Sequence, residues 1–108
     1  MWFLISAADL ESYLDEGRNI YLIDLRNREA FDQEHIRGAV SLPGYELAEQ
    51  VWRLPADRLV VLYCYHGPQS MLAARKLARR NYRVADLCGG IQAYRDYRGK
   101  HLVRDIAR

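Results

Sequence analysis

Several features that mark large classes of protein are scarce or absent in this chain. Its 108 residues include only two cysteines, and Lys plus Arg leave a net charge of only +2 over Asp plus Glu. The charged residues are interspersed instead of gathered into a basic stripe, which argues against a dedicated nucleic-acid binder. The longest apolar run near the amino terminus, 2-WFLI-5, is too short for a signal peptide or a membrane span.

Repeats, linkers and low-complexity tracts are also missing from the sequence. Half of the residues are hydrophobic, which is enough for one core in a chain of this length. We therefore expect a single domain over residues 1–108, no membrane partner and a cytoplasmic location. Because thiols stay reduced in that compartment, Cys64 and Cys88 are interpreted as chemically active or buried groups and not as a structural disulfide.

Segments typical of strands alternate with segments typical of helices along the chain. Strands are expected at 3–5, 20–24, 39–42, 59–63 and 84–87. Helices are expected at 7–17, 29–35, 45–54, 70–80 and 91–97, followed by a short basic tail. This order predicts an α/β domain with a mostly parallel sheet of about five strands and helices on both faces.

Local signals support some of these boundaries. Ser6 stands where an N-cap belongs, and Asp9 follows three residues later, as in a capping box. Asn81 follows the helix expected at 70–80 and suits a left-handed C-terminal cap. The run 59-LVVLY-63 is the most hydrophobic β-prone segment, so we expect it to form the central strand.

Cys64 directly follows that strand and precedes the loop 65-YHGPQS-70. Ligands of parallel α/β sheets gather at the carboxyl ends of the strands, where the start of the next helix offers free N–H groups and a positive dipole end. Such a setting favours the thiolate of a cysteine, which is its nucleophilic form. Gly67 permits a tight turn around the sulfur, Pro68 contributes no N–H, and Ser70 is expected to cap the helix or to bind an anion. A buried cysteine before an ordinary turn is the alternative explanation.

Six ordered segments extend this interpretation across nearly the whole chain. They are 24-DLR-26, 31-F, 35-HIRGA-39, 42-LP-43, 64-CYHGPQS-70 and 87-LCGGIQAY-94. The set resembles the rhodanese domain, and most of all the small single-domain thiosulfate sulfurtransferases. That family carries an Asp-x-Arg at the end of an early strand, a His-Ile-x-Gly-Ala segment, a cysteine that opens a six-residue loop, and a Gly-Gly turn after the last strand.

The resemblance implies a sulfurtransferase that works without cofactor or metal. The thiolate of Cys64 would take the sulfane sulfur of thiosulfate or a similar donor and release sulfite. A thiophilic acceptor, such as cyanide in an assay or a small-molecule or protein thiol in the cell, would then remove the sulfur from the Cys64 persulfide. The backbone N–H groups of the loop at 65–70 would hold the negatively charged outer sulfur.

The sequence departs from the family pattern at three positions. Many rhodaneses carry an arginine five residues after the cysteine, where this chain has Gln69, and the change weakens the expected binding of an anionic donor. Tyr94 replaces a frequent Trp after the Gly-Gly turn, and Glu34 replaces a frequent Gly before the His-Ile pair. Both are interpreted as packing changes.

Other polar residues of the same motifs have two interpretations each. Asp24 and Arg26 are expected to brace neighbouring loops through charge-assisted hydrogen bonds, although their place also suits contact with substrate. The His66 side chain is expected to point outward, with a direct role in charge or proton transfer as the alternative. Tyr65 has the same two interpretations, the second being a place in the pocket wall.

Two clusters of basic residues are interpreted as solvated surface. The first lies on the helix expected at 70–80 and contains Arg75, Lys76, Arg79 and Arg80. The second lies on the carboxyl-terminal tail, where Asp96 and Asp105 are interleaved with Arg95, Arg98, Lys100 and Arg104.

Cys88 ends the last expected strand, which in the resembling fold lies beside the strand that precedes Cys64. One hypothesis is that Cys88 resolves the persulfide by forming a disulfide and releasing sulfide. The other is that Cys88 is an inert buried thiol.

Two further functions compete with sulfur transfer. A phosphatase or arsenate reductase would need an arginine six residues after the cysteine to hold the oxyanion, and that place is Ser70. A non-catalytic rhodanese-like docking module would commonly lack the nucleophile, and Cys64 is retained. We therefore expect a sulfur donor and a thiol acceptor as partners, and no nucleic acid.

Overall fold

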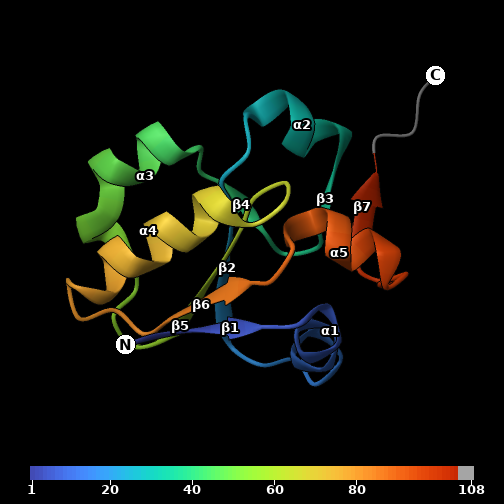
Figure 1. The fold of residues 1–108 in the computed structure, drawn as a ribbon, viewed down its shortest axis with the longest axis horizontal. Helices are drawn as coiled ribbons and strands as arrows, with labels where there is room; N and C mark the ends of the chain where they lie inside the picture. The colour runs from blue at the N-terminus through green and yellow to red at the C-terminus, as the bar shows by residue number, and fades with distance from the viewer. Residues whose placement is uncertain (105–108) are drawn as a thin grey trace.

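The computed structural model describes residues 1–104, and Figure 1 shows how strands and helices alternate along them. The strands are β1 (Trp2–Ile5), β2 (Ile20–Asp24), β3 (Glu34–Ile36), β4 (Val40–Ser41), β5 (Leu59–Tyr63), β6 (Val84–Leu87) and β7 (Leu102–Arg104). The helices are α1 (Ala7–Asp15), α2 (Arg28–Gln33), α3 (Gly44–Gln50), α4 (Pro68–Ala78) and α5 (Gly90–Asp96), with a 3-10 turn η1 (Val51–Arg53) after α3.

Five strands form one parallel sheet in the order β1-β6-β5-β2-β4. β5 lies in the middle of this order, and four of its five residues are buried. A strand with no polar side must be covered by helices on both faces, which a parallel sheet provides. The predicted α/β fold and the central place of residues 59–63 are confirmed.

Alternate residues of β5 face two separate hydrophobic clusters. Val60 and Leu62 pack in the cluster that includes Leu47 of α3 and Leu77 of α4. Val61 and Tyr63 pack in the cluster that includes residues of α1 and α5. Figure 1 shows these helix pairs on opposite sides of the sheet. Cys64 continues the alternation of Val60 and Leu62 and packs in the same cluster, under α3 and α4.

The expected helix signals are present around α1 and α4. The Ser6 hydroxyl accepts from the Asp9 N–H at 3.0 Å, and the Asp9 carboxylate accepts from the Ser6 N–H at 3.4 Å, which completes the predicted capping box. Asn81 follows α4 with a φ of +70°, the left-handed conformation expected there.

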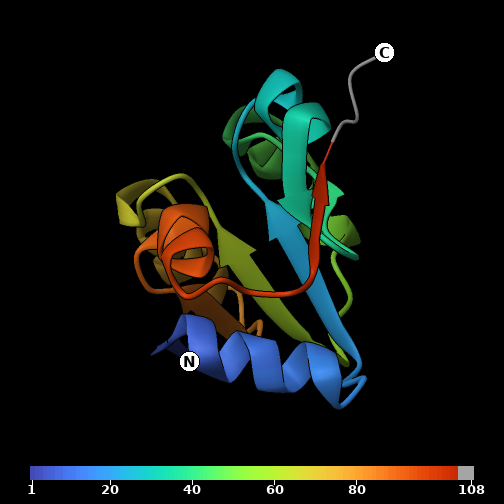
Figure 2. The ribbon, with the colours of Figure 1, turned by 90° about the vertical axis from the view of Figure 1, so that its right-hand side faces the viewer.

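A second sheet, which the sequence did not predict, joins β3 to β7. The two strands pair antiparallel, with Glu34 opposite Arg104 and Ile36 opposite Leu102, and Figure 2 shows β7 lying beside β3. Residues 34 and 35 were expected in a helix and residues 102–104 in a solvated tail, so both predictions were wrong. Strands of three residues carry almost no periodic signal, and their pairing partner lies far away in sequence. Asp105 lies outside the described residues.

Other boundaries shift by a few residues. The strand expected at 39–42 covers only Val40–Ser41, and the helix expected at 45–54 ends at Gln50 and tightens into η1. None of the helices within residues 1–104 is both long and apolar enough to cross a membrane.

Candidate active site

Cys64 lies at the carboxyl edge of the parallel sheet, directly after β5. Its neighbours in the sheet are β6 on one side and β2 on the other. The side chain is only 3% exposed, because α4 and the segment that precedes it fold back over the strand end. The thiol is thus held at the place where parallel sheets bind their ligands.

The segment after Cys64 turns into α4 earlier than the sequence predicted. The helix begins at Pro68 and not at Ser70, and Gly67 is its N-cap. Proline suits the first helical position, since its fixed φ fits the helix and its missing N–H would have no partner there. Gly67 has a φ of +124°, which a side chain would make unfavourable. Only Tyr65, His66 and Gly67 therefore separate the cysteine from the helix.

The Cys64 sulfur has two hydrogen-bond contacts, both with the start of α4. The Gly67 N–H donates to Sγ at 3.1 Å, and the thiol donates to Ser70 Oγ at 3.4 Å. The Ser70 hydroxyl donates in turn to the Gly67 carbonyl at 3.0 Å. Ser70 is completely buried inside the first turn of α4, so the expectation that it caps the helix was wrong.

Several backbone donors of the Cys64 loop and of the first turn of α4 have no acceptor within the described residues. Among residues 1–104, no backbone or side-chain group accepts a hydrogen bond from the N–H groups of Tyr65, His66, Gln69 or Ser70. Gln69 and Ser70 belong to the first turn of α4, where the positive end of the helix dipole lies. An anion at the sulfur would find these donors and this dipole already in place.

The segment that follows the Gly89–Gly90 turn binds the first two carbonyl groups of the loop, those of Cys64 and Tyr65. The Ile91 N–H donates to the Cys64 carbonyl at 2.9 Å, and the Gln92 N–H donates to the Tyr65 carbonyl at 3.2 Å. A Cβ on Gly90 would lie 2.5 Å from the Cys64 oxygen and 2.4 Å from the Tyr65 oxygen, so only glycine allows this approach. The start of α5 thereby fixes the start of the loop.

Asp24 and Arg26 form a buried pair at the end of β2. The Arg26 guanidinium donates to both Asp24 oxygens, at 3.1 Å and 2.8 Å, and to the Glu34 carbonyl at 2.5 Å. Burial lowers the pKa of Arg26, but Asp24 more than offsets this and leaves it raised. With these donors engaged, Arg26 braces the segment that leads into β3.

The rings of Tyr65 and His66 lie on the outer surface of the loop. Both side chains are exposed, and their ring centroids are 4.3 Å apart. The Arg95 guanidinium lies 5.6 Å from the Tyr65 ring centroid. The two rings therefore point outward, as expected for His66.

Comparison with known proteins places this arrangement in a family. The sequence model of the rhodanese-like domain matches residues 6–97, which include four of the five strands of the parallel sheet, all but β1, and the Cys64 loop. The chain belongs to the rhodanese-like family.

Relatives of this rhodanese-like chain include both short and long proteins. It is 32% identical over 84 residues to the thiosulfate sulfurtransferase GlpE of Shewanella oneidensis, covering 77% of this chain and 83% of GlpE. It is 37% identical over 93 residues to the probable adenylyltransferase/sulfurtransferase MoeZ of Mycobacterium tuberculosis, covering 83% of this chain and 24% of MoeZ.

Solved structures agree with the fold. A rhodanese-related protein from Thermoplasma volcanium superposes with a TM-score of 0.84 at 27% identity, covering 94% of this chain and 97% of that one. The protein BH2092 from Bacillus halodurans gives a TM-score of 0.81 at 31% identity, covering 90% of this chain and 74% of that one.

The unusual Gln69 of this rhodanese-like chain is exposed beside a groove between α3 and α4. Its amide Nε2 donates weakly to the Leu25 carbonyl at 3.5 Å. The groove has a volume of about 330 Å³, and Lys76 and Arg80 lie along it together with apolar residues. Arg75 and Lys76 of α4 and Arg79 and Arg80 directly after it are all exposed, as predicted.

Glu34 does more than fill space, contrary to the sequence interpretation. Its carboxylate pairs with Arg95 at 2.5 Å and also with Arg104. Burial raises the pKa of Glu34, but the two arginines outweigh it and leave the pKa lowered. Arg95 is half-buried and Arg104 is solvated, as expected for a tail, but both pair with Glu34 and so connect α5 and β7 to β3.

Cys88 is exposed, so the interpretation as a buried thiol was wrong. Its N–H donates to the Ile5 carbonyl at 2.8 Å, which continues the sheet beyond β6. Cys88 lines a hollow together with Asp86, a completely buried residue that the sequence analysis did not single out. A charged residue inside the short apolar run 84-VADL-87 was the signal that could have found it.

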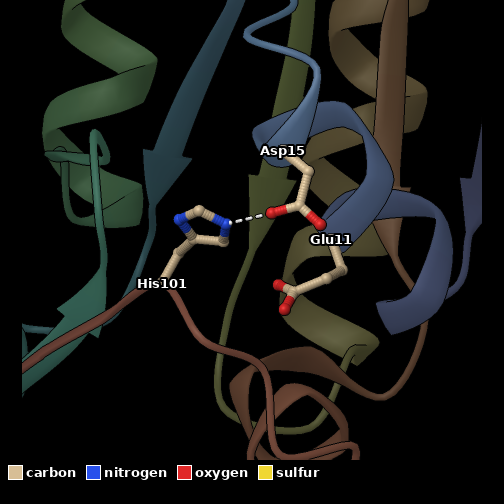
Figure 3. Close-up of side chains that lie close together, drawn as sticks. All are labelled: Glu11, Asp15 and His101. Atoms are coloured by element: carbon tan, nitrogen blue, oxygen red, sulfur yellow. Dashed lines mark hydrogen bonds and ion pairs between the residues drawn. The ribbon is translucent and has the colours of Figure 1, made fainter.

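A cluster away from Cys64 brings together Glu11, Asp15 and His101, as Figure 3 shows. His101 Nε2 and Asp15 Oδ1 are 2.8 Å apart. Glu11 accepts from the Tyr94 hydroxyl and, at 2.9 Å, from the Lys100 N–H, while the Lys100 ammonium lies 3.4 Å from Asp15. The carboxylate oxygens of Glu11 and Asp15 are therefore already hydrogen-bonded, and the Lys100 ammonium already supplies a positive charge. The cluster fits a set of contacts that connects α1 to the segment before β7 better than a metal centre.

Proposed function

We propose that this chain transfers sulfane sulfur from thiosulfate or a similar donor to a thiophilic acceptor through a persulfide on Cys64. The Cys64 thiolate attacks the outer sulfur of the donor, and sulfite leaves with the electron pair of the broken bond. The acceptor, a small-molecule or protein thiol, then attacks the outer sulfur of the persulfide and frees the Cys64 thiolate.

The observation that carries this proposal is the hydrogen bond from the Gly67 N–H to Cys64 Sγ at 3.1 Å, in a segment whose neighbouring N–H groups have no acceptor within residues 1–104. A persulfide bears negative charge on its outer sulfur, and preorganised backbone donors stabilise such charge without reorganising. The sulfurtransferase names of the short relatives and of MoeZ point the same way.

The same geometry disfavours phosphate chemistry. A phosphatase loop of this kind holds its oxyanion with an arginine six residues after the cysteine, and here Ser70 occupies that place, buried and bonded to the Gly67 carbonyl. A docking module without activity would not need free N–H donors around a buried thiol. Sulfur transfer accounts for both features.

The test is intact mass spectrometry of the purified protein after incubation with thiosulfate. We expect one added sulfur atom per chain, which cyanide removes as thiocyanate and which Cys64→Ser abolishes. Sulfite in place of thiosulfate is the control, because it has no sulfane sulfur to give. A protein that gains no sulfur but hydrolyses an aryl phosphate would overturn the proposal.

A further inference from the structure

A second hollow, separate from the α3–α4 groove, lies beside the Cys64 loop. It has a volume of about 340 Å³, and its walls come from the Cys64 loop, the start of α4, β1 and the end of β6. His66 and Gly67 of the loop, Met71 of α4, and Asp86 and Cys88 of the β6 end all contribute to it. The hollow thus has the loop that follows Cys64 on one wall and a second cysteine on another.

The two cysteines start from equivalent places on neighbouring strands. Leu62 of β5 pairs with Asp86 of β6, and each cysteine follows two residues later in its own chain segment. Parallel neighbours lie roughly 5 Å apart in a sheet. The side chains differ in access, however, since Cys64 is 3% exposed and Cys88 is open to solvent.

Asp86 is a second, independent sign of chemistry in this hollow. The residue is completely buried, and neither carboxylate oxygen has a hydrogen-bond partner among residues 1–104. A buried acid without a partner is costly to keep, so it calls for an explanation. Burial raises the pKa of Asp86 to about 6, and the nearby Ser70 hydroxyl, which also contacts Cys64 Sγ, opposes that rise.

We propose that Cys88 takes the sulfane sulfur from the Cys64 persulfide and presents it to acceptors at the surface, with the Asp86 carboxylate accepting the Cys88 thiol proton. This relay rests on the proposed function, because it needs a loaded Cys64. The relay makes Cys88 a second residue that carries sulfur. The acceptor thiol would then approach the hollow that Cys88 lines.

The step balances without any further reactant. Asp86 takes the proton of the Cys88 thiol and passes it to the outer sulfur of the anionic persulfide Cys64–S–S⁻ as the Cys88 thiolate attacks that sulfur. A bond forms between Cys88 Sγ and that sulfur, the bond to Cys64 Sγ breaks, and its electron pair stays on Cys64 as thiolate. The products are Cys88–S–SH and free Cys64, with no net oxidation.

The geometry favours this relay over the disulfide suggested by the sequence. A disulfide requires attack at Cys64 Sγ itself, which is buried and enclosed by Gly67 and Ser70. It would also need a reductant after every cycle. The outer sulfur extends away from Sγ, so it is the atom that a neighbouring thiol can approach.

Peptide mapping of the full chain tests the relay, since trypsin separates the cysteines into residues 59–75 and 84–95. The protein is loaded with thiosulfate, quenched with an alkylating reagent at successive times, and digested. We expect the extra sulfur first on the Cys64 peptide and then on the Cys88 peptide, at a rate independent of protein concentration. In Cys64→Ser, Cys88 should carry none.

The outcomes separate the two proposals. No sulfur on either peptide overturns the proposed function. Sulfur that stays on Cys64 while Cys88 never gains any, or a Cys64–Cys88 disulfide with sulfide release, overturns the relay and leaves the proposed function standing.

Asp86→Asn tests the proton acceptor. The groups that titrate in the hollow are His66, Asp86 and Cys88, while β1 and α4 contribute uncharged Leu4, Pro68 and Met71. Transfer to Cys88 should slow by roughly tenfold or more in Asp86→Asn at neutral pH, and the rise in rate through about pH 6 should disappear. His66→Asn should retain that rise. A wild-type pH profile in Asp86→Asn would remove Asp86 from the relay.

Discussion

The backbone of Gly67 has a φ of +124°, and its N–H is the donor that reaches the Cys64 sulfur. A Cβ there would lie 3.5 Å from the Gly89 nitrogen, so the cost of a side chain is conformational and not a clash. Gly67→Ala should shift this donor and slow sulfur loading by on the order of a hundredfold, as for one lost oxyanion donor. Mass spectrometry of timed loading with thiosulfate measures the rate.

Gly38→Ala is the matched control, because Gly38 also has a positive φ, +88°, but no atom lies within 4 Å of its added Cβ. It should load sulfur at the wild-type rate. Equal losses in the two variants would show that general strain, and not the donor, controls loading.

Gln69 occupies the place where many rhodaneses carry arginine, and its side chain is exposed. Gln69→Arg should lower the KM for thiosulfate by about threefold to fivefold, because an exposed charge pair contributes up to about 1 kcal/mol. Gln69→Glu should raise the KM, and added salt should reduce both effects. Steady-state kinetics with cyanide as acceptor measures this. Changes in the same direction would contradict an electrostatic origin.

Asp86 should make the protein less stable as pH rises. Its pKa is 3.8 in an unfolded chain and about 6 in the fold, so the folded state binds the proton more tightly. That stabilisation is complete below pH 3.8 and is lost as pH rises through about 6. Asp86→Asn cannot ionise, so at pH 8 it should be more stable than wild type by up to about 3 kcal/mol, the equivalent of this pKa change.

Urea unfolding at high and low pH checks this prediction. Near pH 4 the gain from Asp86→Asn should be small, because wild-type Asp86 is then protonated in the fold. Asp32→Asn, at an exposed site on α2, should show neither effect. A gain that does not change with pH would contradict the ionisation argument.

Among the secondary-structure elements, the β3–β7 pair depends on one acid. Glu34 is paired with Arg95 of α5 and Arg104 of β7, which leaves its pKa below the ordinary 4.5. This contribution is present above pH 4.5 and is lost as pH falls through the lowered value. Glu34→Gln should therefore cost roughly 1–2 kcal/mol of unfolding free energy at pH 7.

Chemical denaturation across the acid range measures the difference, which should shrink as Glu34 becomes protonated in the wild type. Glu29→Gln on α2 is the control, because Glu29 is exposed and has no ion-pair partner within residues 1–104. A loss in Glu34→Gln that persists at acid pH would point to packing instead of charge.

An element could be predicted from the sequence where residues close together in the chain determine it, and not where distant residues do. The run 59-LVVLY-63 and the Ser6–Asp9 box are local signals, and both gave the right element. The β3–β7 pair was missed because Glu34 meets Arg104 only after the chain has folded. The start of α4 was placed at Ser70 because serine is a common cap, whereas Pro68 and the φ of Gly67 decide it.

The candidate site divides in the same way. The place of Cys64 follows from a strand that ends directly before it, so the sequence was sufficient. The contacts of Ser70, the exposure of Cys88 and the isolated carboxyl of Asp86 depend on how β6, α4 and the loop pack together. No spacing of residues along the chain predicts those contacts.

At the scale of the whole molecule, Tyr94 ties the first helix to the last described segment. Its ring is completely buried, its hydroxyl donates to Glu11 of α1, and the same oxygen accepts from the His101 N–H at 3.0 Å. Tyr94→Phe leaves these buried groups without partners, which costs about 1–3 kcal/mol. The melting temperature should fall by roughly 5–15 °C for a domain of this size.

Thermal unfolding followed by circular dichroism measures this change. Tyr97→Phe serves as the control, because Tyr97 is exposed on the same helix end and should melt like the wild type. Sulfur loading at 25 °C should be retained in Tyr94→Phe, since Glu11 and His101 lie in the cluster away from Cys64. A melting temperature equal to that of wild type would show that the hydroxyl network contributes little.

The contrast in access between the two thiols has a practical consequence. Cys64 is enclosed by its loop at 3% exposure, whereas Cys88 is open to solvent beside that loop. A bulky maleimide dye should therefore attach to Cys88 and leave Cys64 unmodified. The chain thus carries a natural attachment point for a fluorescent reporter next to the reacting sulfur, so that donor binding can be followed by light without an engineered cysteine.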